Sequence, residues 1–168
     1  RLMIASGGDQ REAMITEGCK IDNILIVGYD EEGNGYGVSE GVRISVPASR
    51  ISDCLGVQIV SCSEDGKRAT AKIISVKKRR AVRGYEPPFN ESELDQIERS
   101  IPKGSYVYSK KLKLYHATQA VHILGIKGKQ RIIFVRPKLE DENYEAHITN
   151  ILDRPAEEIL STFYSHFG

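Results

Sequence analysis

The sequence predicts an α+β fold that is mostly β: a small antiparallel barrel, then a helix, a β-rich second module and a C-terminal helix. Short apolar or alternating segments, separated by turn signals, recur through residues 1–83 and predict the barrel. Prolines interrupt residues 84–104, which also contain a helical pattern, and strand patterns return over residues 105–168. We therefore expect a barrel module, a linker with a short helix, and a β-rich module with a terminal helix.

Five or six short strands are expected before the linker. One of them, NILIVG, is a continuous apolar run typical of a buried strand, whereas the segment after the glycine-rich turn alternates. Asp65-Gly66 predicts a tight hairpin turn, because glycine readily adopts a positive φ. The expected strand segments are LMIAS (2–6), REAMI (11–15), NILIVG (23–28), YGVSEGVRISVP (36–47), VQIVSC (57–62) and ATAKIISV (69–76).

The linker and the second module carry boundary signals for two helices. Asn90 is expected to cap the first helix, with Glu93 completing a capping box. Pro155 opens the C-terminal helix, where Glu157 complements the helix dipole and Phe163 lies on the apolar side. Between the helices the expected strands are YVYS (106–109), LKLYHA (112–117), AVHILGI (120–126), RIIFV (131–135) and YEAHITNIL (144–152).

The segment YDEEGNGYGV (29–38) raises the question of a phosphate-binding loop. A P-loop needs a lysine and a hydroxyl residue after its last glycine, and a dinucleotide fingerprint needs the spacing G-x-G-x-x-G. Here Gly33, Gly35 and Gly37 have the spacing G-x-G-x-G, three acids lie beside them, and the following residues alternate as in a strand. The segment is therefore interpreted as a turn between strands.

The same turn carries a resemblance to a known family. Residues 22–78 resemble a TRAM domain, a small OB-like RNA-binding barrel. The matching features are the opening strand NILIVG, the turn DEEGNGYG, a strand that ends in Val46-Pro47, and a last strand with a basic tail. After Pro47 the segment ASRISDCLG stands in place of the Gly-x-x-x-Gly-Glu turn of that family. The resemblance implies an OB-fold and RNA binding.

A second resemblance covers residues 2–26. The segment LMIASGGDQREAMITEGCKIDNILI is similar to the opening strands of ribonuclease E/G proteins. The metal-binding aspartates of that family have no counterpart in this sequence. Both resemblances imply contact with RNA.

Charge is strongly segregated along the chain, although the formal net charge is only +1. Residues 66–85 and 103–138 contain eight and nine basic residues respectively and no acidic residue. The segments around these two blocks are predominantly acidic. Two basic blocks of this kind favour a polyanionic partner such as RNA.

The first basic block contains VKKRRAVRGY (76–85). We predict that its cations contact phosphates and that its tyrosine stacks on a base. A solvated linker between two modules would have the same composition, so the sequence leaves both interpretations open. The residues concerned are Lys77, Lys78, Arg79, Arg80, Arg83 and Tyr85.

The second block contains YVYSKKLKLYH (106–116), which is expected to form a strand. Alternate residues of a strand share a face, so Lys111, Lys113 and Tyr115 would lie together. A face of lysine and tyrosine suits single-stranded nucleic acid. The alternative is an exposed sheet edge whose lysines discourage aggregation. A second basic hairpin is expected to extend this surface through Lys127, Lys129 and Arg131.

No metal or cofactor site is expected. His116 and His122 lack a Cys or carboxylate at a supporting spacing, so they are interpreted as ordinary packed or surface histidines. Cys19, Cys54 and Cys62 form no C-x-x-C pair, and their odd number argues against a disulfide scaffold. These observations favour a reducing, cytoplasmic environment, with Cys54 and Cys62 as core thiols. No apolar run is long enough to span a bilayer, so no membrane contact is expected.

These features favour a non-catalytic RNA-binding protein or module as the leading hypothesis. Two alternatives stay open. One is an interaction or assembly protein whose basic face meets an acidic partner. The other is an RNA-processing or RNA-modifying enzyme, although the sequence shows no recognisable pair of nucleophile and base.

Overall fold

The computed structural model describes residues 15–82 and 86–167. Within these ranges ten strands form two sheets, accompanied by two α-helices and one 3-10 helix, which confirms the predicted α+β, mostly β class. Within the described residues the chain divides into two compact units, one of residues 15–30, 34–82 and 86–88, the other of residues 31–33 and 89–167. The strand expected at 2–6 and nearly all of the one expected at 11–15 lie outside the described residues.

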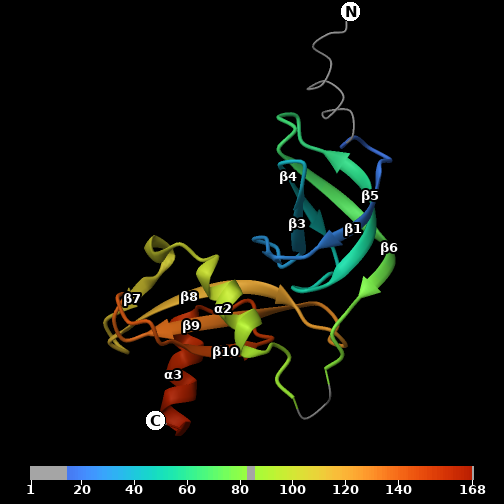
Figure 1. The fold of residues 1–168 in the computed structure, drawn as a ribbon. Helices are drawn as coiled ribbons and strands as arrows, with labels where there is room; N and C mark the ends of the chain where they lie inside the picture. The colour runs from blue at the N-terminus through green and yellow to red at the C-terminus, as the bar shows by residue number, and fades with distance from the viewer. Residues whose placement is uncertain (1–14, 83–85, 168) are drawn as a thin grey trace, which may run out of the picture. The chain divides into compact units, whose positions relative to one another are not determined.

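The first unit is a curled six-stranded sheet (Figure 1) with the strand order β1-β5-β6-β4-β3-β2. All neighbouring strands are antiparallel except β4 and β6, which run parallel. The strands are β1 (Lys20–Leu25), β2 (Gly28–Tyr29), β3 (Gly35–Ser39), β4 (Val42–Val46), β5 (Cys54–Cys62) and β6 (Arg68–Lys78).

Two of the expected strands differ in detail from the prediction. The apolar run NILIVG is divided, because β1 pairs with β5 and the two-residue β2 pairs with β3. The alternating segment 36–47 forms the β3–β4 hairpin, whose turn holds Glu40 and Gly41 at positive φ. Alternate residues of β4 face the core of this unit, and Ile44 and Val46 are both completely buried there.

Glycines in β3 allow the sheet to curl tightly. Gly37 faces the interior, where a Cβ atom would lie only 2.6 Å from the side chain of Ile24. Gly35 faces the same way, and a Cβ there would lie 2.7 Å from Ile26. Register shifts along β5 and β6 add further bends, since a bulge increases the local twist of a strand. The side chains between these glycines therefore point outward.

The second unit contains a four-stranded antiparallel sheet with the order β10-β9-β8-β7. Segments 112–117 and 120–126 were expected as separate strands, but β8 pairs with β9 without interruption as far as His122 opposite Lys129. The elements are α2 (Glu91–Arg99), η1 (Lys103–Ser105), β7 (Val107–Ser109), β8 (Leu114–His122), β9 (Lys129–Arg136), β10 (Glu145–Thr149) and α3 (Ala156–Phe167).

The two α-helices of this unit pack on opposite faces of its sheet. The predicted capping box of α2 is confirmed, with Asn90 Oδ1 accepting from the backbone N–H of Glu93 at 2.8 Å. Arg136 of β9 points toward α2, where its Nη2 lies 2.5 Å from Oε2 of Glu98. Its neighbour Val135 points the other way and packs with Leu160 of α3.

The apolar side of α3 is narrower than the sequence predicted. Leu160 is completely buried, whereas Phe163 retains 38% of its exposure. The Phe163 ring lies against His147, with ring centroids 4.6 Å apart, so it belongs to the margin of the core and not to its centre. Over residues 15–82 and 86–167, no helix combines the length and apolar character needed to cross a membrane.

Candidate nucleic-acid interface

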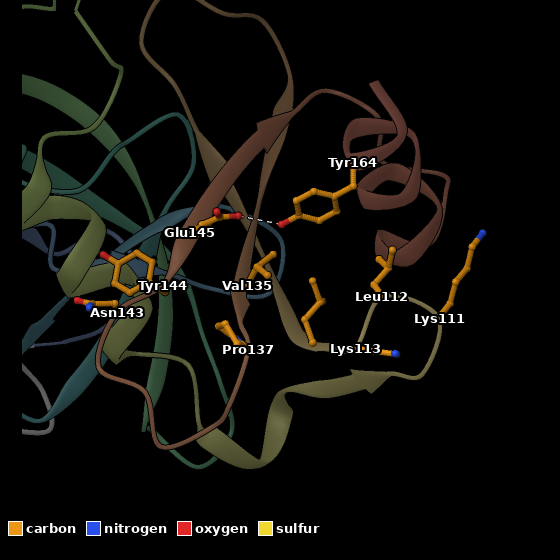
Figure 2. A pocket seen from close by; sticks show the side chains of 10 residues that line it. Lys111, Leu112, Lys113, Val135, Pro137, Asn143, Tyr144, Glu145 and Tyr164 are labelled. Carbon is orange, nitrogen blue, oxygen red and sulfur yellow. Dashed lines mark hydrogen bonds between the residues drawn. The ribbon is translucent and has the colours of Figure 1, made fainter. Parts of the chain in front are cut away.

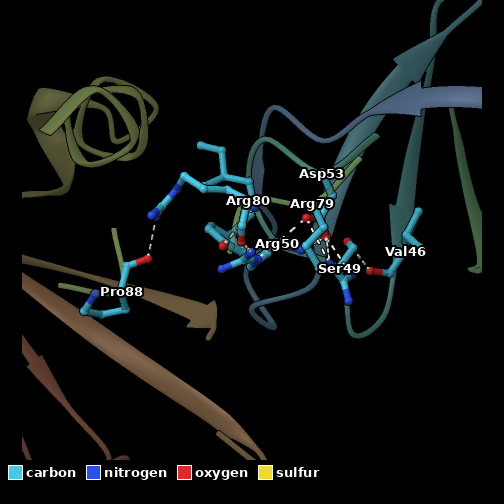
Figure 3. A network of polar contacts seen from close by, with 9 residues as sticks. Val46, Ser49, Arg50, Asp53, Arg79, Arg80 and Pro88 are labelled. Atoms are coloured by element: carbon cyan, nitrogen blue, oxygen red, sulfur yellow. Dashed lines mark hydrogen bonds and ion pairs between the residues drawn. The ribbon is translucent and has the colours of Figure 1, made fainter. Parts of the chain in front are cut away.

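The basic segment that follows β6 does not act as one exposed cluster. Lys77 and Lys78 are exposed at the end of β6, as the sequence predicted. Arg79 instead donates to Asp53, with Nη2 2.8 Å from Oδ2 (Figure 3). Asp53 is almost completely buried, so this interaction satisfies a carboxylate inside the fold. The prediction that Arg79 is free to contact phosphate missed this partner, which lies far away in the sequence.

Arg80 is also partly held by the fold. Its side chain donates from Nη2 to the carbonyl oxygen of Pro88 at 2.9 Å, and its own carbonyl oxygen accepts from the buried Arg50 (Figure 3). The predicted contacts of Arg83 and Tyr85 lie outside the described residues. Of this predicted cluster, Lys77 and Lys78 are therefore the exposed described members.

The expected strand face of Lys111, Lys113 and Tyr115 does not form. Both lysines lie in the turn between β7 and β8, and Lys113 has a φ of 57°, which is incompatible with an extended strand. Tyr115 lies in β8 opposite Tyr108, with ring centroids 4.9 Å apart. The sequence missed this arrangement because a turn of four residues interrupts the apparent alternation.

The second basic hairpin is only partly exposed. Lys127 and Lys129 lie on the surface, whereas Arg131 is buried and donates from Nη1 to the carbonyl oxygens of Ile151 and Arg154. Burial lowers the pKa of Arg131, whose role here is to bind the backbone before α3. The prediction of Arg131 as a surface contact is therefore wrong.

The histidines and cysteines form no metal site within residues 15–82 and 86–167. Burial lowers the pKa of His116, which favours its neutral form. None of the three cysteines forms a disulfide. Cys54 is half-buried but Cys62 is exposed, so the prediction of Cys62 as a core thiol is wrong.

A different basic surface lies on the outer face of the first unit, and sequence reasoning missed it. Because Gly35 and Gly37 face inward, Tyr36 and Val38 of β3 face outward. On β4 the residue opposite Val38 is Arg43, which lies beside Arg68 of β6. The alternation of YGVSEGVRISV was the signal that could have identified this face. Its outward residues are Tyr36, Val38, Arg43, Ser45, Arg68, Thr70, Lys72 and Lys78.

The centre of this outer face is a stack of a guanidinium on an aromatic ring. The Cζ atom of Arg43 lies 3.8 Å from the centroid of the Tyr36 ring, well within cation–π distance. The ring also lies against the backbone of Gly28, where a Cβ atom would be 2.9 Å from the ring. These two contacts hold the ring, and the side chain of Arg43 is itself half-buried.

The outer face combines cations with exposed apolar surface. It presents Arg68, Lys72 and Lys78 on β6 and the exposed Val38 on β3. Beyond Lys72 two register shifts interrupt the alternation of β6, so Val76 lies opposite the buried Leu55. Strands β3, β4 and β6 contain no acidic residue, whereas acids lie in the turns at their ends. The strands thus present positive charge bounded by negatively charged turns.

No protein-family model matches the chain, and no curated protein matches it significantly. The residues and the geometry of the two units are therefore the basis for assigning a function.

Proposed function

We propose that this protein is a non-catalytic module that binds single-stranded RNA on the outer face of its first unit. The observation that carries the proposal is the composition of the outward residues on β3, β4 and β6. They combine a guanidinium stacked on a tyrosine, three further cations and the exposed apolar side chain of Val38, without an acidic residue on the strands. Single strands bind surfaces that offer both stacking planes and phosphate contacts.

The strand pairing supports an OB-like fold for this unit. Taken together, β1 and β2 occupy the place of a first strand that pairs with two partners, β5 and β3. The remaining strands follow as second to fifth, with the parallel pair between the third, β4, and the fifth, β6. OB-folds bind oligonucleotides on the face of their second and third strands. Here those strands are β3 and β4, which carry Tyr36 and Arg43.

The chemistry of this face suits a single strand better than a duplex. A base can stack on the guanidinium of Arg43, which lies over the Tyr36 ring. Arg68 and Lys72 lie on the neighbouring strand, at positions where they can meet phosphates. Carboxylates in the bordering turns, such as Glu40 and Asp65, would repel phosphates and confine the strand to the sheet face.

The test is a titration of a labelled single-stranded RNA, followed by fluorescence anisotropy over a series of salt concentrations. The double variant Arg68→Gln, Lys72→Gln should bind more weakly than the parent. Each lost phosphate contact removes about 0.7 from the slope of log affinity against log salt, so we expect a reduction of about 1.4. The matched control is Lys110→Gln, Lys138→Gln, which removes the same charge from exposed positions of the second unit.

Equal slopes for the two double variants would show that general charge, and not this face, determines binding. Absence of RNA binding by the parent at low salt would overturn the proposal. Polyglutamate serves as the competitor that represents an acidic protein partner. Displacement of RNA by polyglutamate at the same charge concentration would favour the interaction-protein alternative.

A further inference from the structure

A pocket of about 610 Å³ opens in the second unit, on the face of its sheet that carries α3 (Figure 2). This volume lies in the range of about 300–1,000 Å³ that is typical of small-molecule sites. The pocket is not part of the outer face of the first unit, to which RNA binding is assigned above. Strands β8 and β9, the turn before β8, the segment before β10 and helix α3 all contribute to its walls.

The floor of the pocket is apolar and buried. Leu114 of β8 and Val135 of β9 belong to the core cluster that includes Leu160 of α3. Leu112 and Pro137 continue the apolar surface toward the opening. Such a floor favours a ligand with an apolar body, because binding removes apolar area of both partners from water.

One wall of the pocket has its polar groups already satisfied. The Tyr164 hydroxyl donates to Oε1 of Glu145 at 2.8 Å, as Figure 2 shows. Burial and this hydrogen bond raise the pKa of Tyr164 to about 12, so the phenol keeps its proton at neutral pH. The Glu145 carboxylate thus has a donor within the fold, and this wall is the acidic side of the pocket.

The opposite rim carries two cations. Lys111 and Lys113 lie on the turn between β7 and β8, and both side chains are exposed. Neither lysine forms a salt bridge with any of the described residues. Both lysines place positive charge at the margin of the pocket, and the Lys111 side chain extends away from the floor in Figure 2. The geometry joins an apolar cavity to a positively charged rim.

We propose that this pocket binds a small carboxylate with an apolar body, such as an aromatic or branched organic acid. The body lies on Leu114, Val135 and Pro137, and the carboxylate faces Lys111 and Lys113. A neutral or cationic molecule of the same shape gains the apolar contact but not the charge complementarity. This site is independent of RNA binding, because it lies wholly in the second unit.

The experiment titrates the full chain against 2-naphthoate, followed by the fluorescence of the ligand, which is readable because the chain contains no Trp. The neutral analogue 2-naphthylmethanol is titrated in parallel. We expect saturable binding at one site, with the carboxylate bound more tightly than the alcohol. In the variant Lys111→Gln, Lys113→Asn the affinity for naphthoate should fall about fivefold to tenfold, since each exposed ion pair contributes modestly.

Both substitutions are chosen to preserve the fold. Asn tolerates the positive φ of position 113 better than most residues, and Lys111 is exposed. The matched control Lys110→Gln, Lys127→Gln removes the same charge from exposed lysines that do not line the pocket, and should stay within twofold of the parent. Unchanged melting temperatures check the fold of both variants.

Three results would overturn the proposal. The first is no saturable binding of naphthoate by the parent, and the second is equal affinity for naphthoate and its neutral analogue. The third is an equal loss in both double variants, which would indicate attraction by overall charge. Each of these results is compatible with RNA binding by the first unit, so the two proposals fail separately.

Discussion

Arg79 and Asp53 form a bidentate contact that connects the end of the last barrel strand to a buried carboxylate. Arg79 Nη2 lies 2.8 Å from Oδ2 of Asp53, and Arg79 Nε lies 3.2 Å from each carboxylate oxygen. The backbone N–H of Arg50 donates to the same carboxylate at 3.1 Å. The basic segment that begins at Val76 is therefore bound to the first unit through Arg79, its third cation.

Because of this contact, substitutions of two neighbouring cations should differ in their effect on the free energy of unfolding. Arg79→Gln should lower the free energy of unfolding by about 1–3 kcal/mol, because it leaves a buried acceptor poorly satisfied. Lys77→Gln, two residues earlier and exposed, should change it by less than about 0.5 kcal/mol. Urea unfolding followed by circular dichroism measures both variants. Equal urea midpoints for Arg79→Gln and Lys77→Gln would show that the contact of Arg79 with Asp53 does not contribute to stability.

The elements of both units could largely be predicted from local patterns. The capping box of Asn90 and Glu93 and the β3–β4 hairpin each depend on residues close together in the chain. The C-terminal helix was likewise predicted from a local signal, the proline at position 155 that precedes it. Such features are set by backbone chemistry within a few residues, and this chemistry is visible in the sequence.

The candidate site was harder to predict because it depends on pairing between distant strands. Arg43 and Arg68 become neighbours only through the parallel pairing of β4 with β6. The pairing of Arg79 with Asp53 spans 26 residues and removes one cation from the predicted surface. The turn before β8 likewise separates Lys113 from the face of Tyr115. Counting charges along the chain cannot distinguish a structural cation from an exposed one.

Two positions of α3 should differ in their contribution to stability. Leu160→Ala should cost about 2–5 kcal/mol, because Leu160 is completely buried between the helix and the sheet. Phe163→Ala should cost less than the roughly 3–5 kcal/mol of a fully buried phenylalanine, since its ring is partly exposed. Chemical unfolding of the two variants gives the comparison. A larger loss at Phe163 would place that ring in the core.

Stability should fall at high pH through the tyrosines of the second unit. Burial raises the pKa of Tyr106 from 10.0 to about 12, and its hydrogen bond to Glu98 acts in the same direction. Between these values the unfolded chain loses the phenolic proton while the folded protein keeps it. The unfolded state then binds fewer protons, so the stabilisation present below pH 10 is lost as pH rises toward 12.

Tyr106→Phe removes one titrating group and should make this pH dependence shallower. The remaining dependence comes from Tyr144 and Tyr164, whose pKa values burial also raises. Tyr108→Phe is the matched control, since that ring is about half exposed. Unfolding free energies measured on both sides of pH 10 make the comparison. If the unfolding free energy of Tyr106→Phe fell with pH as steeply as that of the parent, Tyr106 would not be a source of this pH dependence.

The three cysteines should be reduced and unequal in reactivity. In the native protein Cys62 should react first with a thiol reagent, because it is exposed while Cys19 and Cys54 are half-buried. After denaturation without reductant, three free thiols should titrate. Cys62→Ser identifies the fast phase, which should disappear in that variant. An intact mass lower by two protons would contradict the assignment of three free thiols.

The last prediction separates stacking from charge on the proposed RNA face. Arg43→Lys keeps the positive charge but removes the planar guanidinium that lies 3.8 Å from the Tyr36 ring centroid. RNA affinity should therefore fall by about 1–3 kcal/mol, the range for loss of one stacked base, while the slope against log salt stays nearly unchanged. Arg68→Lys is the matched control, because Arg68 lies on the adjacent strand and is assigned a phosphate contact that lysine can also make. Anisotropy titrations at several salt concentrations distinguish the two variants. Equal affinities would assign Arg43 to phosphate contact alone, and the stacked guanidinium would then have no part in recognising the bases.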